Sequence, residues 1–413
     1  MRAIVPVVIL AFMTFIVNIS ASLMTPFLPV YAQSLGSMYG IDIGLFTSVF
    51  LLTRVFMNSA SGMTSDRFGR RKLIILGIAI CTASSLSFAF LQDWYVILAL
   101  RAMQGIGSSM VWTPATALVG DMTPLGKRGY AMGVYNSISM SGWVLGPALG
   151  GGIQWYSRNA LVMPLLDSFR TVFYTSAVLL AFSLALVLLF VKEPMVRSQP
   201  KPPTGEGGTA LKHVSIDTSI RRALIAMSFL VFAFGLIVSL VEPLLVYHTQ
   251  IVYGLTADEV TSSMAMIYSV SGFFIIAVQL LAGRLADRFS KKMMIAVSAL
   301  AAQFLTLLMP FAVNVANIGE LIVLWYAFYS LATPAYLALL QDLFPSRLRG
   351  TLTGVFLTIF DFGSLIGPIA GFLIYDNFSR TLPFIMSGVI GIATVLALLA
   401  FAKEPKKGEI SQV

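Results

Sequence analysis

Twelve stretches of mostly apolar residues follow one another along this chain, and they limit its fold more than any other feature. Examples are Leu73–Leu91, Thr171–Val191 and Leu382–Ala402. A helix needs about 20 apolar residues to cross the hydrocarbon core of a bilayer. The runs are continuous and do not alternate with polar residues, which excludes a membrane β-barrel. We therefore expect an all-α membrane protein whose main solvent is the lipid bilayer.

The composition agrees, because 57% of the residues are hydrophobic and 11% are charged, whereas about a quarter are charged in a soluble domain. Short polar loops separate the predicted helices. The helices are expected at residues 4–31, 41–64, 73–91, 95–119, 129–152, 168–191, 223–248, 260–283, 292–312, 319–342, 350–375 and 382–402.

One long hydrophilic connection divides the twelve helices into two sets of six. Its centre, Ser198–Gly208, is rich in proline and glycine and cannot bury apolar surface, so we interpret it as a flexible linker. The expected organisation is an N-terminal bundle over residues 1–191, a linker over 192–222 and a C-terminal bundle over 223–413.

The basic residues are distributed unevenly over the loops. Of the 27 lysines and arginines, 22 fall on one side of the membrane and 3 on the other, while Arg54 and Arg101 lie within helices. Loops rich in lysine and arginine stay in the cytoplasm. We expect a multi-pass protein of the plasma membrane or bacterial inner membrane with both termini cytoplasmic. This distribution also explains the formal net charge of +9 without nucleic-acid binding.

The residue types needed for most cofactor chemistry are scarce. Cys81 is the single cysteine, which excludes an internal disulfide, and two separated histidines, His213 and His248, do not suggest a metal site. No glycine-rich loop with a following lysine indicates nucleotide binding. The sequence predicts no cofactor, no metal and no enzymatic activity.

The two halves repeat at a fixed offset of 221 residues. Segment 62–68 returns as 283–289, and segment 142–147 returns as 363–368. Parallel repeats of six helices are an architecture of transporters. The first apolar run has the features of a cleaved signal peptide, with Arg2 before it and Ser20–Ser22 near its end. Its counterpart in the second half favours a retained helix instead.

The segment Gly62–Lys72 resembles the signature loop between helices 2 and 3 of the major facilitator superfamily. Arg101–Gly107 resembles the helix 4 motif of that family, and Gly142–Gly151 resembles the helix 5 motif of its proton-coupled drug antiporters. The motif residues are Gly62, Asp66, Arg67, Gly69, Arg70, Arg71, Gly142, Gly146 and Pro147, with Asp287 and Arg288 in the degraded second copy of the loop.

The resemblance implies two six-helix bundles that rock about a central substrate path. It also implies that Asp66 meets the N-terminus of the helix that starts near Gly350 and latches the cytoplasmic side shut. The basic residues of the loop are alternatively simple topology anchors. Gly142 and Gly146 form a bare face for tight helix packing, and Pro147 permits a bend.

Four ionisable residues lie within predicted helices, where charge is costly and is retained mainly for function. Arg54 and Asp361 lie at matching depth near the middle of the membrane, and Arg101 and Glu242 lie nearer the outer surface. All four are candidates for proton or substrate binding. The resemblance implies that the helices of Arg54 and Asp361 pack against each other across the two halves, and we hypothesise that the two residues pair in one state and separate in the other. Alternatively, each lines the central path separately.

Other polar and aromatic residues are candidates for lining the path. An aromatic cavity suits a lipophilic substrate, including a cationic one, although the first helix has no acidic residue to bind a cation. The alternative for each of these side chains is a role in packing or in a membrane-interface belt. They are Asn18, Gln104, Trp112, Asn136, Tyr268, Gln279, Trp325, Tyr326 and Tyr329.

The sequence therefore favours a monomeric, proton-coupled exporter of drug-like or amphipathic small molecules. The alternatives are a proton symporter or uniporter that imports a small metabolite, and a receptor of the same fold that does not transport.

The predicted topology can be tested by labelling single cysteines in a background without Cys81. An impermeant maleimide applied outside intact cells should label Asn317→Cys and leave Ser198→Cys unlabelled, because the basic linker is predicted to be cytoplasmic. Labelling of Ser198→Cys from outside would reverse the orientation.

Overall fold

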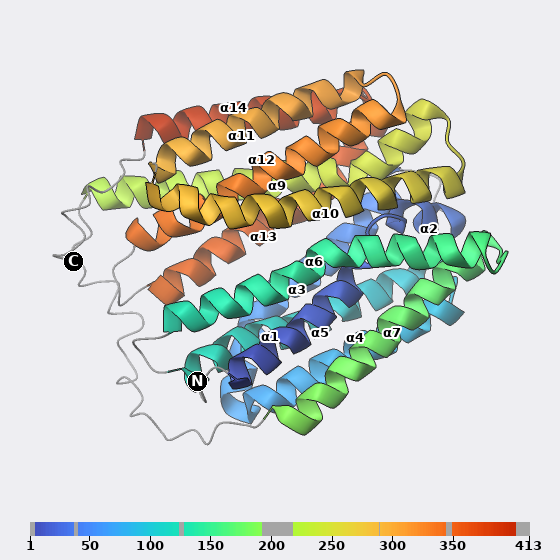
Figure 1. Cartoon of the computed structure of the whole chain (residues 1–413), viewed down its shortest axis with the longest axis horizontal. Coiled ribbons are helices and arrows are strands. Elements are labelled where there is room, and N and C mark those ends of the chain that lie inside the picture. Colours follow the sequence, from blue (N-terminus) through green and yellow to red (C-terminus); the bar gives the residue numbers. More distant parts are fainter. Residues whose placement is uncertain are drawn as a thin grey trace.

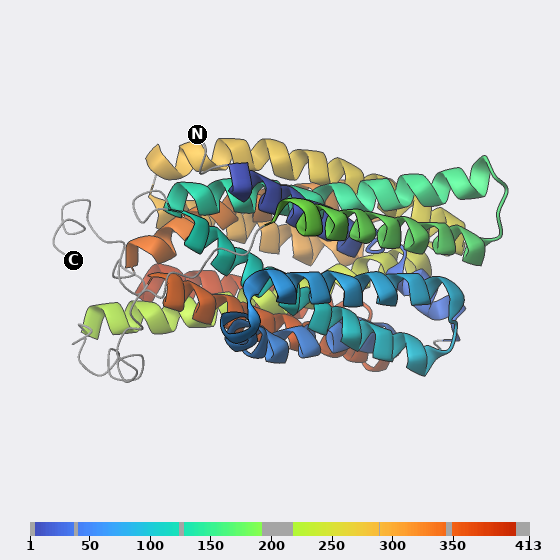
Figure 2. The ribbon, with the colours of Figure 1, turned by 90° about the horizontal axis from the view of Figure 1, so that it is seen from below.

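Long helices aligned with the long axis of the molecule make up this fold (Figures 1 and 2). The computed structural model describes residues 5–36, 40–123, 128–191, 218–288, 290–343 and 349–401. The described part of the chain begins and ends at the same end of the bundle (Figure 1). We name it the terminal end, and the other the opposite end.

The helices form two groups of six membrane-crossing segments, one from each half of the chain, as predicted. The first group lies below the second in Figure 1. It comprises α1 (Val5–Ser22) with the short α2 (Leu28–Ser34), then α3 (Gly40–Phe68), α4 (Arg70–Phe90), α5 (Trp94–Met122), α6 (Arg128–Asn159) and α7 (Leu165–Phe190). The second group comprises α9 (Thr218–Tyr253), α10 (Ala257–Arg288), α11 (Lys291–Leu308) with the 3₁₀ turn Met309–Phe311, α12 (Val315–Leu343), α13 (Arg349–Asn377) and α14 (Leu382–Phe401).

Most helices are longer than the apolar runs that predicted them. Nine of the described helices are long and apolar enough to cross a membrane, and α1, α5 and α6 are shorter or more polar. Hydropathy marks only the lipid-spanning part, whereas backbone hydrogen bonding continues into the polar ends. For this reason α6 ends at Asn159 rather than 152, and α9 begins at Thr218 rather than 223. The predicted linker up to residue 217 lies outside the described residues.

The first predicted helix is not continuous. α1 ends at Ser22 and α2 begins at Leu28, with a turn between them. Pro26 has no N–H to donate to the preceding turn and disfavours helical backbone at Thr25. The prediction of one helix over 4–31 was therefore wrong in its last third.

The packing differs between the two ends. At the opposite end a single hydrophobic core joins both halves, with Phe27 and Phe46 from one and Leu244 and Phe372 from the other. Toward the terminal end the described residues form separate cores. One lies wholly in the N-terminal half, around α1, α4, α5 and α6, and two lie in the C-terminal half. The halves are thus packed shut at the opposite end.

Two antiparallel helix pairs form the seams between the halves, α3 with α13 and α6 with α10. In the first, a Cβ on Gly44 would lie 2.8 Å from the carbonyl oxygen of Pro368 and 3.2 Å from Phe372. In the second, Gly151 packs directly against Ala265. The repeat offset relates Gly44 to Ala265 and Phe372 to Gly151, so the two seams are copies of one contact. Glycine allows the close approach in both.

A bulky side chain at Gly44 should loosen the opposite end. Overpacking costs about 1–3 kcal/mol, which corresponds to a shift of about 5- to 150-fold in an equilibrium. Ser48 donates to the carbonyl oxygen of Leu365 in the same seam (3.0 Å). We expect Gly44→Leu to raise the maleimide labelling rate of Ser48→Cys about tenfold. Gly120→Leu is the matched control, because nothing lies within 4 Å of a Cβ there. Equal rates in both variants would contradict the seam.

Candidate functional site

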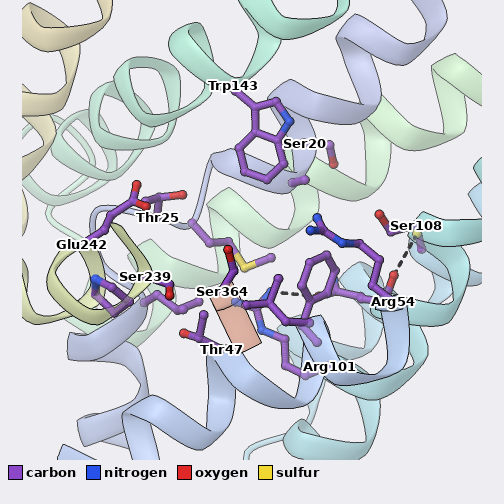
Figure 3. A pocket seen from close by; sticks show the side chains of 18 of the residues that line it. Ser20, Thr25, Thr47, Arg54, Arg101, Ser108, Trp143, Ser239, Glu242 and Ser364 are labelled. Carbon is purple, nitrogen blue, oxygen red and sulfur yellow. Dashed lines mark hydrogen bonds between the residues drawn. The ribbon is translucent and has the colours of Figure 1, made fainter. Parts of the chain in front are cut away.

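A cavity of about 360 Å³ lies between the two halves (Figure 3). All of the helices α1–α7 contribute to its wall from the N-terminal half, and α9, α10 and α13 contribute from the other. Apolar side chains form more than half of the wall. The charged and polar lining residues include Ser20, Thr25, Thr47, Arg54, Arg101, Gln104, Ser108, Ser239, Glu242 and Ser364.

A smaller chamber of about 180 Å³ adjoins the cavity. Thr25, Trp143, Glu242 and Tyr268 line both spaces, and Tyr326 lines only the smaller one. Glu242 thus lies where the two chambers meet. Together they offer a mostly apolar, partly aromatic volume with a carboxylate at its junction, which suits a small organic molecule.

An ion pair joins the halves at the edge of the cavity. Arg54 Nη2 lies 2.5 Å from Asp361 Oδ1, and both side chains are mostly buried, at 21% and 14% exposure. Arg54 lies at the middle of α3, so the pair is far from either end of the seam. The structure therefore brings together the two residues hypothesised to pair. The repeat places Ile275 and Met140 at the corresponding positions of the other seam, so at this depth only the α3–α13 seam carries an ion pair.

Arg101 extends from α5 into the same cavity without a carboxylate partner among the described residues. It is 8% exposed, and its Nη1 donates to Gln104 Oε1 (3.1 Å). Its guanidinium lies over the ring of Phe46, 4.4 Å from the centroid, and more loosely over Phe88. Cation–π contact partly replaces the lost hydration of the charge.

Glu242 faces the cavity from α9. Its Oε1 accepts a hydrogen bond from the Tyr326 hydroxyl (2.8 Å), and the Tyr268 ring meets the Tyr326 ring edge-on. No lysine or arginine in the described ranges pairs with this carboxylate. Because α9 continues through Pro243, the backbone beside Glu242 loses one helical hydrogen bond.

The remaining lining candidates divide according to their position. Gln104, Trp112 and Tyr268 line the cavity and Tyr326 the smaller chamber, whereas the side chain of Gln279 lies outside the described residues.

Four candidates do not line either space. Asn18 is fully buried and donates to the carbonyl oxygen of Ser139 (2.6 Å), which ties α1 to α6. Trp325 is buried in the core and stacks on Tyr329, and Asn136 is exposed. Apolar runs give the depth of a residue, but the side of the helix it occupies depends on packing between helices.

Within the residues that the structure describes, the motif loop after α3 forms contacts that hold neighbouring helix ends together. Gly69 has a φ of 100°, which separates α3 from α4. Arg70 forms an ion pair with Asp121, and Arg71 Nη2 donates to the carbonyl oxygen of Leu188 at the end of α7 (2.7 Å). Lys292 does the same for Leu399 at the end of α14 (2.7 Å). Both cations thus satisfy C-terminal helix carbonyls.

The proposed latch stays a prediction. Arg67 is exposed, whereas the side chains of Asp66, Asp287, Arg288 and the first turns of α13 lie outside the described residues.

The glycines of the helix 5 motif pack within one half. A Cβ on Gly146 would lie 2.8 Å from the carbonyl oxygen of Ile19, and a Cβ on Gly142 would lie closer still to the carbonyl oxygen of Phe15. Both contacts join α6 to α1, and Pro147 lies next to them within α6. The motif therefore builds a tight helix pair beside the cavity.

Sequence reasoning missed two features of the site. Trp143 lines both chambers, although the sequence motif around it singles out only the neighbouring glycines and proline. Arg158 forms a two-point ion pair with Asp258 at the opposite end, with Nε 2.8 Å from Oδ1. Arg158 could have been singled out from the sequence, because it is one of only three basic residues on the side of the membrane that is poor in lysine and arginine.

Comparisons with known proteins agree with this architecture. The family model described as Major Facilitator Superfamily matches residues 10–368 and, in a second match, 262–412. Quinolone resistance protein NorA of Staphylococcus aureus (strain MSSA476) is 26% identical over 398 residues, which is 95% of each chain. Multidrug resistance protein 2 of Bacillus subtilis (strain 168) is 24% identical over 401 residues, covering 95% of this chain and 94% of that protein.

Solved structures show the same fold. The crystal structure of a D-xylose-proton symporter has a TM-score of 0.77 at 14% identity, covering 96% of this chain and 97% of that one. A transporter of the POT family in complex with a peptide conjugate has a TM-score of 0.76 at 15% identity, covering 98% and 96%.

Charge reversal tests the Arg54–Asp361 contact. Arg54→Asp or Asp361→Arg should each place two like charges in the seam, and breaking such a mostly buried pair costs about 3–5 kcal/mol. We expect each single variant to lower the midpoint of thermal unfolding in detergent by several degrees, and the double swap to recover most of the loss. A double variant no more stable than the singles would show that the two side chains do not interact.

Proposed function

The chain belongs to the major facilitator superfamily and is a multi-pass membrane transporter, and we propose that it exports drug-like, amphipathic compounds in exchange for protons. The observation that carries this proposal is the central cavity, whose apolar wall holds the carboxylate of Glu242 at the junction of two chambers. A carboxylate can bind a proton or a cationic group, and exchange of one for the other is the basis of antiport.

The relatives support a drug-like substrate. The proteins named above are a quinolone resistance protein and a multidrug resistance protein. In this chain Trp112, Trp143 and Tyr268 give the cavity aromatic faces, which accept varied ring systems with few specific hydrogen bonds.

The closed end supports entry from the cytoplasm. The distribution of basic residues favours a cytoplasmic terminal end in the cell membrane, which makes the opposite end extracytoplasmic. That end is held shut by the shared core and by the Arg158–Asp258 ion pair. In this state a substrate would reach the cavity from the cytoplasmic side.

Two carboxylates offer a route for coupling. Protonation of Glu242 would remove the charge that holds a cation and release substrate. Protonation of Asp361 would remove its attraction to Arg54 and weaken the α3–α13 seam, which lowers the cost of opening the extracytoplasmic side. The rival proposal is that Asp361 binds proton or substrate directly and that the ion pair has no part in rocking.

Everted membrane vesicles test the proposal. With an acidic interior and ethidium outside, the protein should accumulate the dye and release lumenal protons. Glu242→Gln should cut this accumulation at least about tenfold, because a charge that discriminates between bound states is lost. Glu259→Gln is the matched control, since Glu259 is exposed and caps α10 through Thr256.

Each outcome separates the functional classes. Substrate leaving the acidic lumen together with protons would indicate symport. Dye flux that ignores the proton gradient would remove the coupling, and absence of flux across a broad panel of compounds would support a receptor of the same fold.

A further inference from the structure

The charges that line the cavity do not cancel one another locally. Among the described lining residues, Arg54, Arg101 and Glu242 are charged. Arg54 is neutralised by Asp361 at 2.5 Å. Arg101 and Glu242 each face the same cavity and have no ion partner in the part of the chain that the structure describes. One positive and one negative group thus remain.

Arg101 is the less satisfied of the two. One nitrogen donates to Gln104, and two aromatic rings cover part of the guanidinium. Its Nε is buried and has no hydrogen-bond partner. A buried cation normally has a counter-ion, because desolvation of an unpaired charge is expensive. Since no protein carboxylate fills this role in the described structure, an anionic group in the cavity would.

Glu242 is the complementary group. It lies on one side of the cavity in the close-up view, and Arg101 lies on the other (Figure 3). The two belong to different halves, α9 and α5, and do not form an ion pair with each other. Tyr326 donates to the carboxylate, and the buried Tyr268 hydroxyl beside it has no partner. This end of the cavity can therefore accept a cation and one further polar contact.

We propose that the preferred substrates are zwitterionic amphiphiles, with an anionic group bound by Arg101 and a cationic group bound by Glu242. This inference rests on the proposed function and narrows its substrate class. The apolar body of the molecule would lie along the wall between the two charges, against Trp143 and Val238. A fork of guanidinium donors suits a carboxylate in particular. Arg101 is then a specificity residue.

The rival explanation gives Arg101 a purely structural role. Its contacts with Phe46, Phe88 and Gln104 would hold α5 against α3 and α4, and its charge would have no ligand. The two explanations differ for compounds that share one ring system and differ in charge. A structural arginine cannot tell such compounds apart.

Three dyes on one tricyclic scaffold provide this comparison. Tetramethylrhodamine carries a cationic ring system and a free carboxylate, its methyl ester keeps only the cation, and fluorescein keeps only negative charge. Binding to the purified protein in detergent is measured by fluorescence anisotropy, without any proton gradient. We expect tetramethylrhodamine to bind about tenfold more tightly than its ester, the usual scale for one charge-assisted hydrogen bond, and fluorescein to bind most weakly.

Variants assign the preference to a residue. Arg101→Gln should weaken tetramethylrhodamine binding about tenfold and leave ester binding unchanged, and Arg101→Lys should keep part of the preference. Glu242→Gln should weaken both cationic dyes. Arg170→Gln is the control, because Arg170 pairs with Asp167 on α7 away from the cavity.

Equal binding of acid and ester by the unaltered protein would overturn the inference. So would an Arg101→Gln variant that weakens both dyes to the same extent while its unfolding midpoint falls, because that pattern marks a structural role. Export of ethidium by everted vesicles tests the proposed function separately, since ethidium has no anionic group. Ethidium export without a preference for tetramethylrhodamine would leave the proposed function in place and remove this inference alone.

Discussion

The ion pair between Arg54 and Asp361 holds the middle of the interface on which the rest of this structure depends. Both side chains are largely withdrawn from water, and the attraction between such charges is offset to a large extent by their desolvation. The pair therefore adds little net stability while it is intact, but loss of either charge is costly. A contact with this balance is well suited to switching. Adding one proton to Asp361 leaves Arg54 as an unpaired charge that favours separation toward a wetter environment.

The repeat supports the proposal that the two halves rock and that rocking is coupled to protonation. Both seams bring glycine against a neighbouring helix at positions related by the repeat, as Gly44 and Gly151 show. Two equivalent seams allow one half to turn on the other about the pseudo-symmetry axis. The charges break this symmetry, because the ion pair occupies one seam and the other carries apolar residues in its place. In the proposed cycle, the symmetric packing of the seams would allow the motion, and the ion pair at the middle of one seam would control it.

The depth of a residue in the membrane could be predicted from the sequence far better than the face of the helix on which its side chain lies. Hydropathy located the spans. Matched depth, together with the family resemblance that packs their two helices against each other, suggested that Arg54 meets Asp361. The same reasoning placed Asn18 and Trp325 on the substrate path. Asn18 is instead buried between α1 and α6, and Trp325 is buried in the core that joins the two halves. Which face of a helix meets the cavity depends on how all neighbours pack. The ion pair of Arg158 with Asp258 was missed for a related reason, since it joins two helix ends that no local pattern connects.

Opening the opposite end requires that its closing contacts be replaced rather than merely broken. Separation there would expose the shared aromatic core, release Asp258 from Arg158, and free the carboxylate of Asp376 from the backbone N–H of Gly40 (2.7 Å). The free energy of these lost contacts must be offset in the other state by contacts of similar strength at the terminal end. We propose that the motif loop and its second copy supply them. Arg71 and Lys292 of these two loops bind the C-terminal carbonyls of α7 and α14 within each half, which places both loops at the terminal end. A carboxylate at position 66 that met the start of α13 would then mirror Asp376 against the start of α3, so that the two states exchange one helix-terminus contact for another.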